Sequence, residues 1–210
     1  MPLTKIQSLG ITDGTIVNAD INASAAIDAS KLTGLSSDYV RLATSTITAN
    51  TTAVTFDGYF SSTYDTYIIY GNNIILDGSA NISIRYRQSG SDVTSSTYTN
   101  ANHTIDSINN RGFNGQTATG TPQLNGSPPS YSTYEGLGFQ FTISDPNNNQ
   151  ATKYKHMEYR MWYTDSSGYL VQVIGAIINT SSTAVLTGFK ILPSANNFDA
   201  GSIVLYGVKK

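Results

Sequence analysis

The chain has 210 residues, which is enough for one domain of ordinary size and an additional segment. Charged residues are 12% of the sequence, whereas about 25% is usual in globular proteins. The net charge is −2, and no cluster of Lys and Arg in the sequence could neutralise a run of phosphates, so nucleic acid binding is not expected. The absence of cysteine excludes disulfides, thiolate metal sites and cysteine nucleophiles.

Residues 1–43, which we call the N-terminal arm, do not follow the pattern of a globular domain. Their large aliphatic residues are about five positions apart, which fits neither the period of a helix nor that of a strand. A short helix is expected from Ser24 to Leu32, because alanines favour it and Ser24 can cap it. We expect the aliphatic residues to attach the arm to copies of itself or to a larger assembly; they are Leu9, Ile11, Ile16, Ile21, Ile27 and Leu32.

Signals for export and for membrane insertion are not expected in this sequence. Met1-Pro2-Leu3 is not followed by the apolar core of a signal peptide, and no stretch approaches the ~20 apolar residues that a membrane helix needs. The composition nevertheless resembles that of exposed β proteins. A protein made in a host cytoplasm and released in a virus particle would reconcile the two observations, and an ordinary cytoplasmic protein is the alternative.

Residues 44–210 have the two-residue period of β-strands. In 155–163, for example, Met157, Tyr159, Met161 and Tyr163 share one face, opposite His156, Glu158, Arg160 and Trp162. Asp77-Gly78 is a hairpin signal. The pattern predicts an all-β domain, an antiparallel β-sandwich of the jelly-roll kind with eight or nine strands. The expected strand segments are 46–48, 53–56, 67–76, 82–87, 139–143, 155–163, 169–174, 184–192 and 202–208.

Residues 89–135 lack sustained periodicity and are predicted to form a long loop, with an edge strand near Ser96–Tyr98. Tyrosines among Ser, Gly and Asn suit recognition of proteins or glycans, although tyrosine also packs well in sheets. The alternative is packing or contact between copies of the chain. The candidates for contact with a receptor or glycan are Tyr98, His103, Tyr131 and Tyr134.

Candidates for catalysis or metal binding are weak. His103 and His156 have no nearby nucleophile and carboxylate in the arrangement that catalysis requires. Asp145-Pro146-Asn147 resembles the start of a calcium loop, but Gln150 stands where the loop needs glycine. We therefore assign no catalytic residue, cofactor or metal ligand and expect no enzymatic activity.

Several segments of the arm and the β domain carry motifs of a known kind. In the arm these are Ile11–Ile21 and Ala25-Ala26-Ile27 followed by Ser30-Lys31-Leu32. In the β domain they are the segments 60–67, 82–87, 145–146, 189–192 and 197–208. Together these segments resemble phage tail fibre proteins, particularly those of cyanobacterial and marine phages. The resemblance covers the arm and most of 46–210, and it implies a virion component that is usually trimeric and has no cofactor.

The leading hypothesis is therefore a homotrimeric tail fibre in the virion, anchored by the arm and facing a host-surface glycan or protein. The alternative is a capsid decoration or cement protein that contacts other virion proteins of the head. A polysaccharide depolymerase is a third hypothesis. Neither nucleic acid binding nor membrane insertion is expected.

Overall fold

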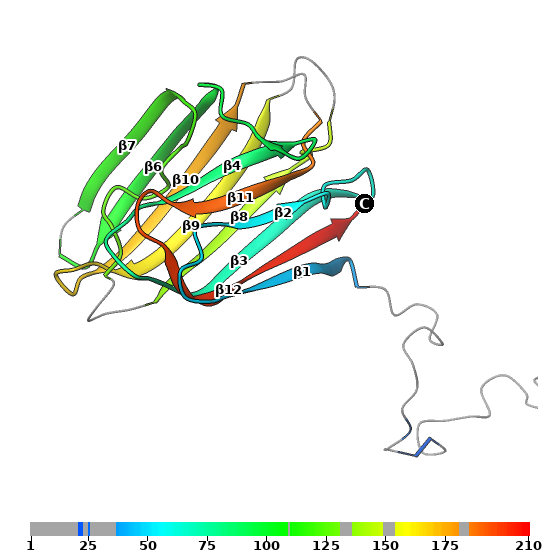
Figure 1. Cartoon of the computed structure of the whole chain (residues 1–210), viewed down its shortest axis with the longest axis horizontal. Helices are drawn as coiled ribbons and strands as arrows, with labels where there is room; N and C mark the ends of the chain where they lie inside the picture. Colours follow the sequence, from blue (N-terminus) through cyan, green and yellow to red (C-terminus); the bar gives the residue numbers. More distant parts are fainter. Residues whose placement is uncertain are drawn as a thin grey trace, which may run out of the picture. The chain divides into compact units, whose positions relative to one another are not determined.

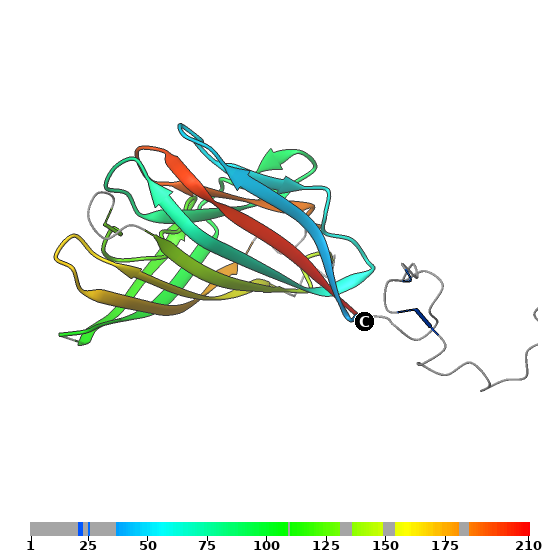
Figure 2. The same cartoon turned by 90° about the horizontal axis from the view of Figure 1, so that it is seen from below.

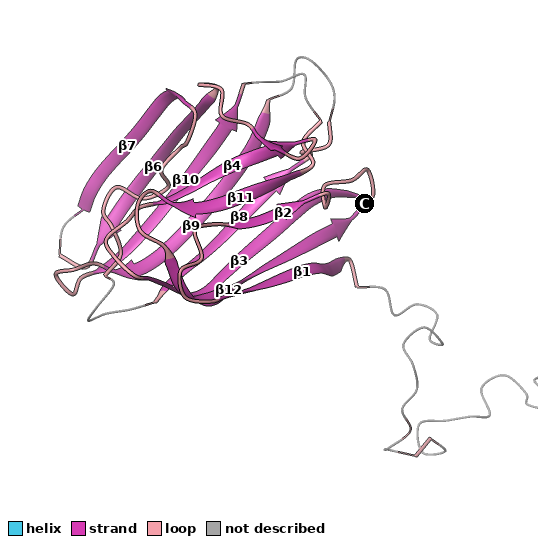
Figure 3. Cartoon of the chain, viewed as in Figure 1, coloured by secondary structure: helices cyan, strands magenta, loops and turns pink. Residues whose placement is uncertain are grey.

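The computed structural model describes residues 21–22, 25, 37–108, 110–130, 136–148, 154–180 and 185–210. The chain divides into two units, Met1–Ser37 and Asp38–Lys210. In the second unit the described residues form twelve strands and no helix (Figures 1 and 3). The strands make two packed antiparallel sheets (Figure 2), which confirms the expected all-β sandwich.

The larger sheet has eight strands and the smaller has four. In spatial order, the large sheet consists of β1 (Tyr39–Ile47), β12 (Phe198–Lys209), β3 (Tyr64–Leu76), β8 (Leu137–Ser144), β9 (Lys155–Thr164), β10 (Leu170–Asn179), β6 (Tyr98–Asp106) and β7 (Asn110–Thr119). The small sheet consists of β2 (Val54–Asp57), β11 (Gly188–Pro193), β4 (Ile82–Gln88) and β5 (Ser91–Asp92). The chain crosses repeatedly from one sheet to the other, so residues distant in sequence meet in one core.

The core lies between the two sheets and is formed by the alternating residues that the sequence indicates. Met157, Tyr159 and Met161 of β9 point inward, and Ile82 and Ile84 of β4 pack from the other layer. Full burial of such a side chain contributes about 1.5–3 kcal/mol. The assignment of faces in 155–163 is thereby confirmed.

Glycines opposite aromatic residues recur in the large sheet. At each of three sites, the aromatic ring occupies the space that a Cβ on the glycine would need. The ring therefore lies across the neighbouring strand, and a larger residue at the glycine would displace it. The pairs are Gly71 with Phe139, Gly138 with Trp162, and Gly175 with Tyr159.

The expected long loop at 89–135 is wrong, because this segment contains β5, β6 and β7. The inward residues of β6 after Tyr98 are Asn100, Asn102 and Thr104, all buried. Since these residues are polar, the strand lacks the hydrophobic alternation that identifies a strand in sequence.

Two further boundaries differ from expectation. Asp77-Gly78 is not a hairpin turn, because it joins β3 and β4, which belong to different sheets. The Asp77 carboxylate accepts hydrogen bonds from the backbone N (2.7 Å) and the Nδ2 (3.0 Å) of Asn197. The first strand begins at Tyr39, before residue 44, where alternation becomes visible in the sequence.

The outer surface of the small sheet carries a network of ion pairs centred on Arg87. Its Nε lies 2.8 Å from an Asp57 oxygen, and its Nη1 contacts Asp92. Asp92 also pairs with Lys190 at 3.0 Å and with Arg85 at 3.5 Å. The network links all four strands of the sheet.

Candidate functional site

The outer face of the large sheet is the candidate binding surface. The small sheet packs on the opposite face, so alternate residues of β8, β9 and β10 point away from the core. On β9 these are His156, Glu158, Arg160 and Trp162, all exposed. The charged and polar groups here are not needed to fill the core and are accessible to a ligand.

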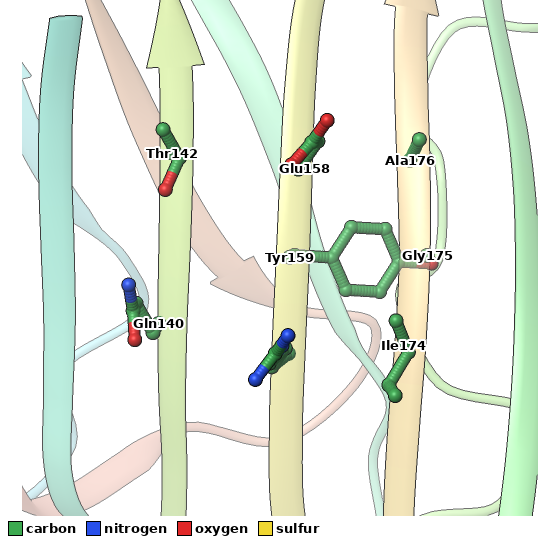
Figure 4. A pocket seen from close by; sticks show the side chains of 8 residues that line it. Gln140, Thr142, Glu158, Tyr159, Ile174, Gly175 and Ala176 are labelled. Atoms are coloured by element: carbon green, nitrogen blue, oxygen red, sulfur yellow. The ribbon is translucent and has the colours of Figure 1, made fainter.

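An open depression of about 440 Å³ lies on this face across β8, β9 and β10 (Figure 4). Its polar groups stand in two neighbouring rows of the sheet. One row is Thr142, Glu158 and Ala176, and the other is Gln140, Arg160 and Ile174. Because neighbouring strands are about 4.8 Å apart, a hydroxyl, a carboxylate, an amide and a guanidinium lie within reach of one small ligand group. The lining is Gln140, Thr142, Glu158, Tyr159, Arg160, Ile174, Gly175 and Ala176.

Trp162 stands in the next row and provides an aromatic surface. Its indole lies over Gly138 and is 45% exposed. It borders a second hollow of about 230 Å³, which Asn72, Asn73 and Gly136 also line. A half-exposed indole offers an apolar face and an N–H donor, which suits stacking on a sugar ring or a side chain.

Apolar residues continue the surface toward the sheet edge at β7. His103 of β6 stacks on Phe113 of β7, with ring centroids 4.6 Å apart and an angle of 21° between the planes. Phe113 is 87% exposed, which is unusual for an aromatic residue on a strand. We call the exposed apolar residues on β10, β6, β7 and the turn between β6 and β7 the apolar strip: Ile105, Ile108, Phe113, Leu170 and Ile174.

The residues expected to contact a receptor separate into three groups. His103 lies on the outer face, next to the apolar strip. Tyr98 belongs to the core instead: it is fully buried, donates a hydrogen bond to the Val93 carbonyl and accepts one from the Tyr86 backbone N. Tyr131 and Tyr134 lie outside the described residues.

Most of the expected attachment residues of the arm also lie outside the described residues. Ile21 is described and is 40% exposed. The others are Leu9, Ile11, Ile16, Ile27 and Leu32.

Sequence reasoning predicted the outward face of β9 but did not identify it as a binding surface. The signal that it missed was apolar residues at outward positions. Trp162, Leu170 and Ile174 interrupt a face that is otherwise polar. A purely solvated face would carry polar residues at these outward positions.

The chemistry of the face suits reversible binding. It combines hydrogen-bonding groups with an exposed indole and an apolar strip, as recognition surfaces do. Among the described residues, no group of three or more His, Asp or Glu side chains is placed to hold a metal ion.

Comparison with known protein families gives no match, and no curated protein matches the sequence. In the part of the chain that the structure describes, no helix has the length and apolar character needed to cross a membrane.

Proposed function

We propose that the chain is a structural protein of a phage particle, a tail fibre protein whose sandwich attaches to the host surface through the outer face of the large sheet. The observation that carries the binding role is the open face itself, where Gln140, Glu158 and Arg160 surround a depression next to Trp162. The virion assignment rests on the resemblance of the arm and β domain to tail fibre proteins.

The arm is proposed to anchor the protein and to support a homotrimer. Its spaced aliphatic residues have no pattern for burial within one chain, so association with other copies would cover them. The composition fits an exposed particle protein, because polar uncharged residues replace the usual charges. Light scattering of the intact chain tests the trimer, and a monomeric mass would contradict it.

The location in the virion is tested by labelling particles with antibody against the β domain and imaging them by electron microscopy. Label on tail fibres is the expected result. A capsid decoration protein is the second candidate, favoured by the apolar strip, since the exposed Phe113 ring suits a fixed protein contact. Label confined to the capsid faces would overturn the tail fibre proposal.

The binding face is tested by adsorbing the fluorescently labelled chain to cells of the host bacterium. Trp162→Ala is expected to weaken adsorption about tenfold or more, the effect of a lost aromatic anchor worth about 2 kcal/mol. Thr55→Ala is the matched control, because Thr55 is exposed on the other sheet. Equal adsorption of both variants and the unmodified chain would refute the role of this face.

A further inference from the structure

A third hollow, of about 220 Å³, lies on the inner side of the large sheet beyond the apolar core. It is bounded by β6, β7 and the segment 123–126 that precedes β8. This segment connects the two layers: the Leu124 N donates to the Ile82 carbonyl of β4, and Asn100 of β6 donates to the Gln123 carbonyl. The hollow is therefore separate from the outer face described above.

Side-chain amides dominate the lining, and no charged residue is part of it. The two lining residues without an amide side chain are glycines. An amide offers both donors and acceptors, so it matches hydroxyl groups without favouring a charged ligand. The amides belong to Asn100, Asn102, Asn114, Gln116, Gln123 and Asn125.

Hydrogen bonds hold several of these amides in place. Asn100 Oδ1 accepts from the Gln116 N at 2.8 Å, and Gln116 Oε1 accepts from the Gln123 N at 2.9 Å. Asn125 Oδ1 accepts from the Ile82 N at 2.8 Å, while its Nδ2 donates to the Ser127 carbonyl. The walls are therefore ordered before any ligand arrives, which reduces the entropy lost on binding.

Asn102 has a buried oxygen that these contacts leave without a partner. The residue is 6% exposed, and its Oδ1 has no hydrogen-bond partner. The same holds for Thr104 Oγ1, two positions along β6. An unpaired buried polar group costs about 1–3 kcal/mol, and such groups are rare in native proteins.

Gly175 explains how Tyr159 comes close to this group. Asn102, Gly175 and Tyr159 are register partners on three adjacent strands. Because Gly175 has no side chain, the Tyr159 ring passes over it and brings its hydroxyl toward β6. Burial raises the pKa of Tyr159 to about 12, with the amides of Asn102 and Asn100 opposing the rise, so the phenol keeps its proton at neutral pH.

We propose that this amide-lined pocket binds one neutral sugar ring through its hydroxyl groups. The volume of about 220 Å³ corresponds to about seven waters at ~30 Å³ each, which is room for a single ring and too little for a chain of them. The lining amides donate to and accept from the sugar hydroxyls, and two of them, Asn102 and Asn114, are register partners on β6 and β7. The ring can belong to a free monosaccharide or to the end of a glycan.

The test is saturation-transfer NMR on the full chain with glucose, galactose, mannose and N-acetylglucosamine. Each sugar is used free and as its methyl glycoside, at up to about 50 mM, well above the roughly millimolar Kd expected of so small a ligand. Signal from at least one sugar is expected. Binding of the free sugar alone identifies a monosaccharide site, and binding of the glycoside as well identifies a glycan end. No signal from any of them overturns the proposal.

Two variants tie the signal to the pocket. Asn102→Leu and Asn114→Leu each remove one lining amide at similar side-chain volume. Each is expected to weaken sugar binding about tenfold, and the urea midpoint of each variant shows whether the fold is retained. Thr55→Ala is the control.

Unchanged sugar affinity in both variants would overturn the proposal. If Asn102→Leu fails to fold, Asn114→Leu decides. Failure here is distinguishable from failure of the attachment function, which is measured by adsorption of Trp162→Ala to host cells.

Discussion

Replacement of Arg87 tests the ion-pair network of the small sheet. The side chain of Arg87 is 15% exposed. Arg87→Met keeps most of its volume but removes the guanidinium. The two carboxylates keep other partners: Thr187 donates to Asp57 at 2.6 Å, and Lys190 donates to Asp92 at 3.0 Å. The free energy of unfolding should therefore fall by about 1.5 kcal/mol, near the low end of the range for charged hydrogen bonds. This is less than the loss expected when a fully buried ion pair is broken.

Urea denaturation at pH 7 measures this loss, because urea leaves charge interactions unscreened. With an m-value of about 2 kcal/mol/M, the midpoint of Arg87→Met should fall by about 0.7 M. Lys210→Met is the matched control, since Lys210 pairs with Asp65 at 2.8 Å but both side chains are more than half exposed (55% and 54%). We expect its midpoint to stay unchanged.

The pH dependence separates an ionic effect from a loss of packing. Partial burial raises the pKa of Asp57, but hydrogen bonds from Thr187 and Arg87 outweigh it, so the pKa lies below its ordinary value. Burial likewise raises the pKa of Asp92, and Lys190 and Arg87 outweigh it. A carboxyl with a lowered pKa in the folded state adds stability above its unfolded pKa of about 3.9 and loses it as the pH falls through the folded value.

The difference in urea midpoint between the unmodified chain and Arg87→Met should thus be constant above about pH 5 and shrink below about pH 4. A difference of the same size at every pH would show that Arg87 stabilises through its hydrocarbon stem and would refute the electrostatic reasoning. So would equal midpoints for Arg87→Met and Lys210→Met at pH 7.

Three further predictions follow from the sheet and the arm. Gly138→Ala should displace the indole of Trp162, the one tryptophan of the sequence, and cost about 1–3 kcal/mol by overpacking; a fluorescence spectrum identical to that of the unmodified chain would contradict it. Gly201→Ala should cost roughly 1–3 kcal/mol in thermal unfolding, because φ is +117° and a Cβ would lie 2.6 Å from a backbone oxygen of the neighbouring β3. Ile16→Asp combined with Ile21→Asp should reduce incorporation of the chain into particles and lower its mass in light scattering, whereas unchanged incorporation would argue against anchoring by the arm.

The sequence predicted the strands whose inward residues are apolar. Met157, Tyr159 and Met161 alternate with charged residues, so both the strand and its faces were visible. The last strand was predicted from residues that are apolar on both faces, and Ile203 and Leu205 on one of them are fully buried. In these segments, burial follows the hydrophobic period that strand geometry imposes.

The strands and sites that the sequence missed are those where polar residues face inward or apolar residues face outward. The inward residues of β6 are polar, so the sequence did not indicate a strand there; they are Asn100, Asn102 and Thr104. Because this segment was interpreted as a loop, Tyr98 was predicted to lie on the surface. On the outer face, the Trp162 indole occupies space that is open only because Gly138 of another strand has no side chain. No local pattern in either segment indicates that these two residues meet. Pairing between distant segments is the information that a local period does not contain.

The position of β1 at the edge of the large sheet has a mechanical consequence. Tyr39, at the start of β1, pairs with Val208, near the end of β12, and the strands of the candidate face lie further into the same sheet. Tension between the chain before Asp38 and a ligand held on β9 acts first on the ladder between β1 and β12, because β1 directly follows Asp38. That ladder has a register shift between Arg41 and Ala43, so this edge is where the sandwich should yield first under load.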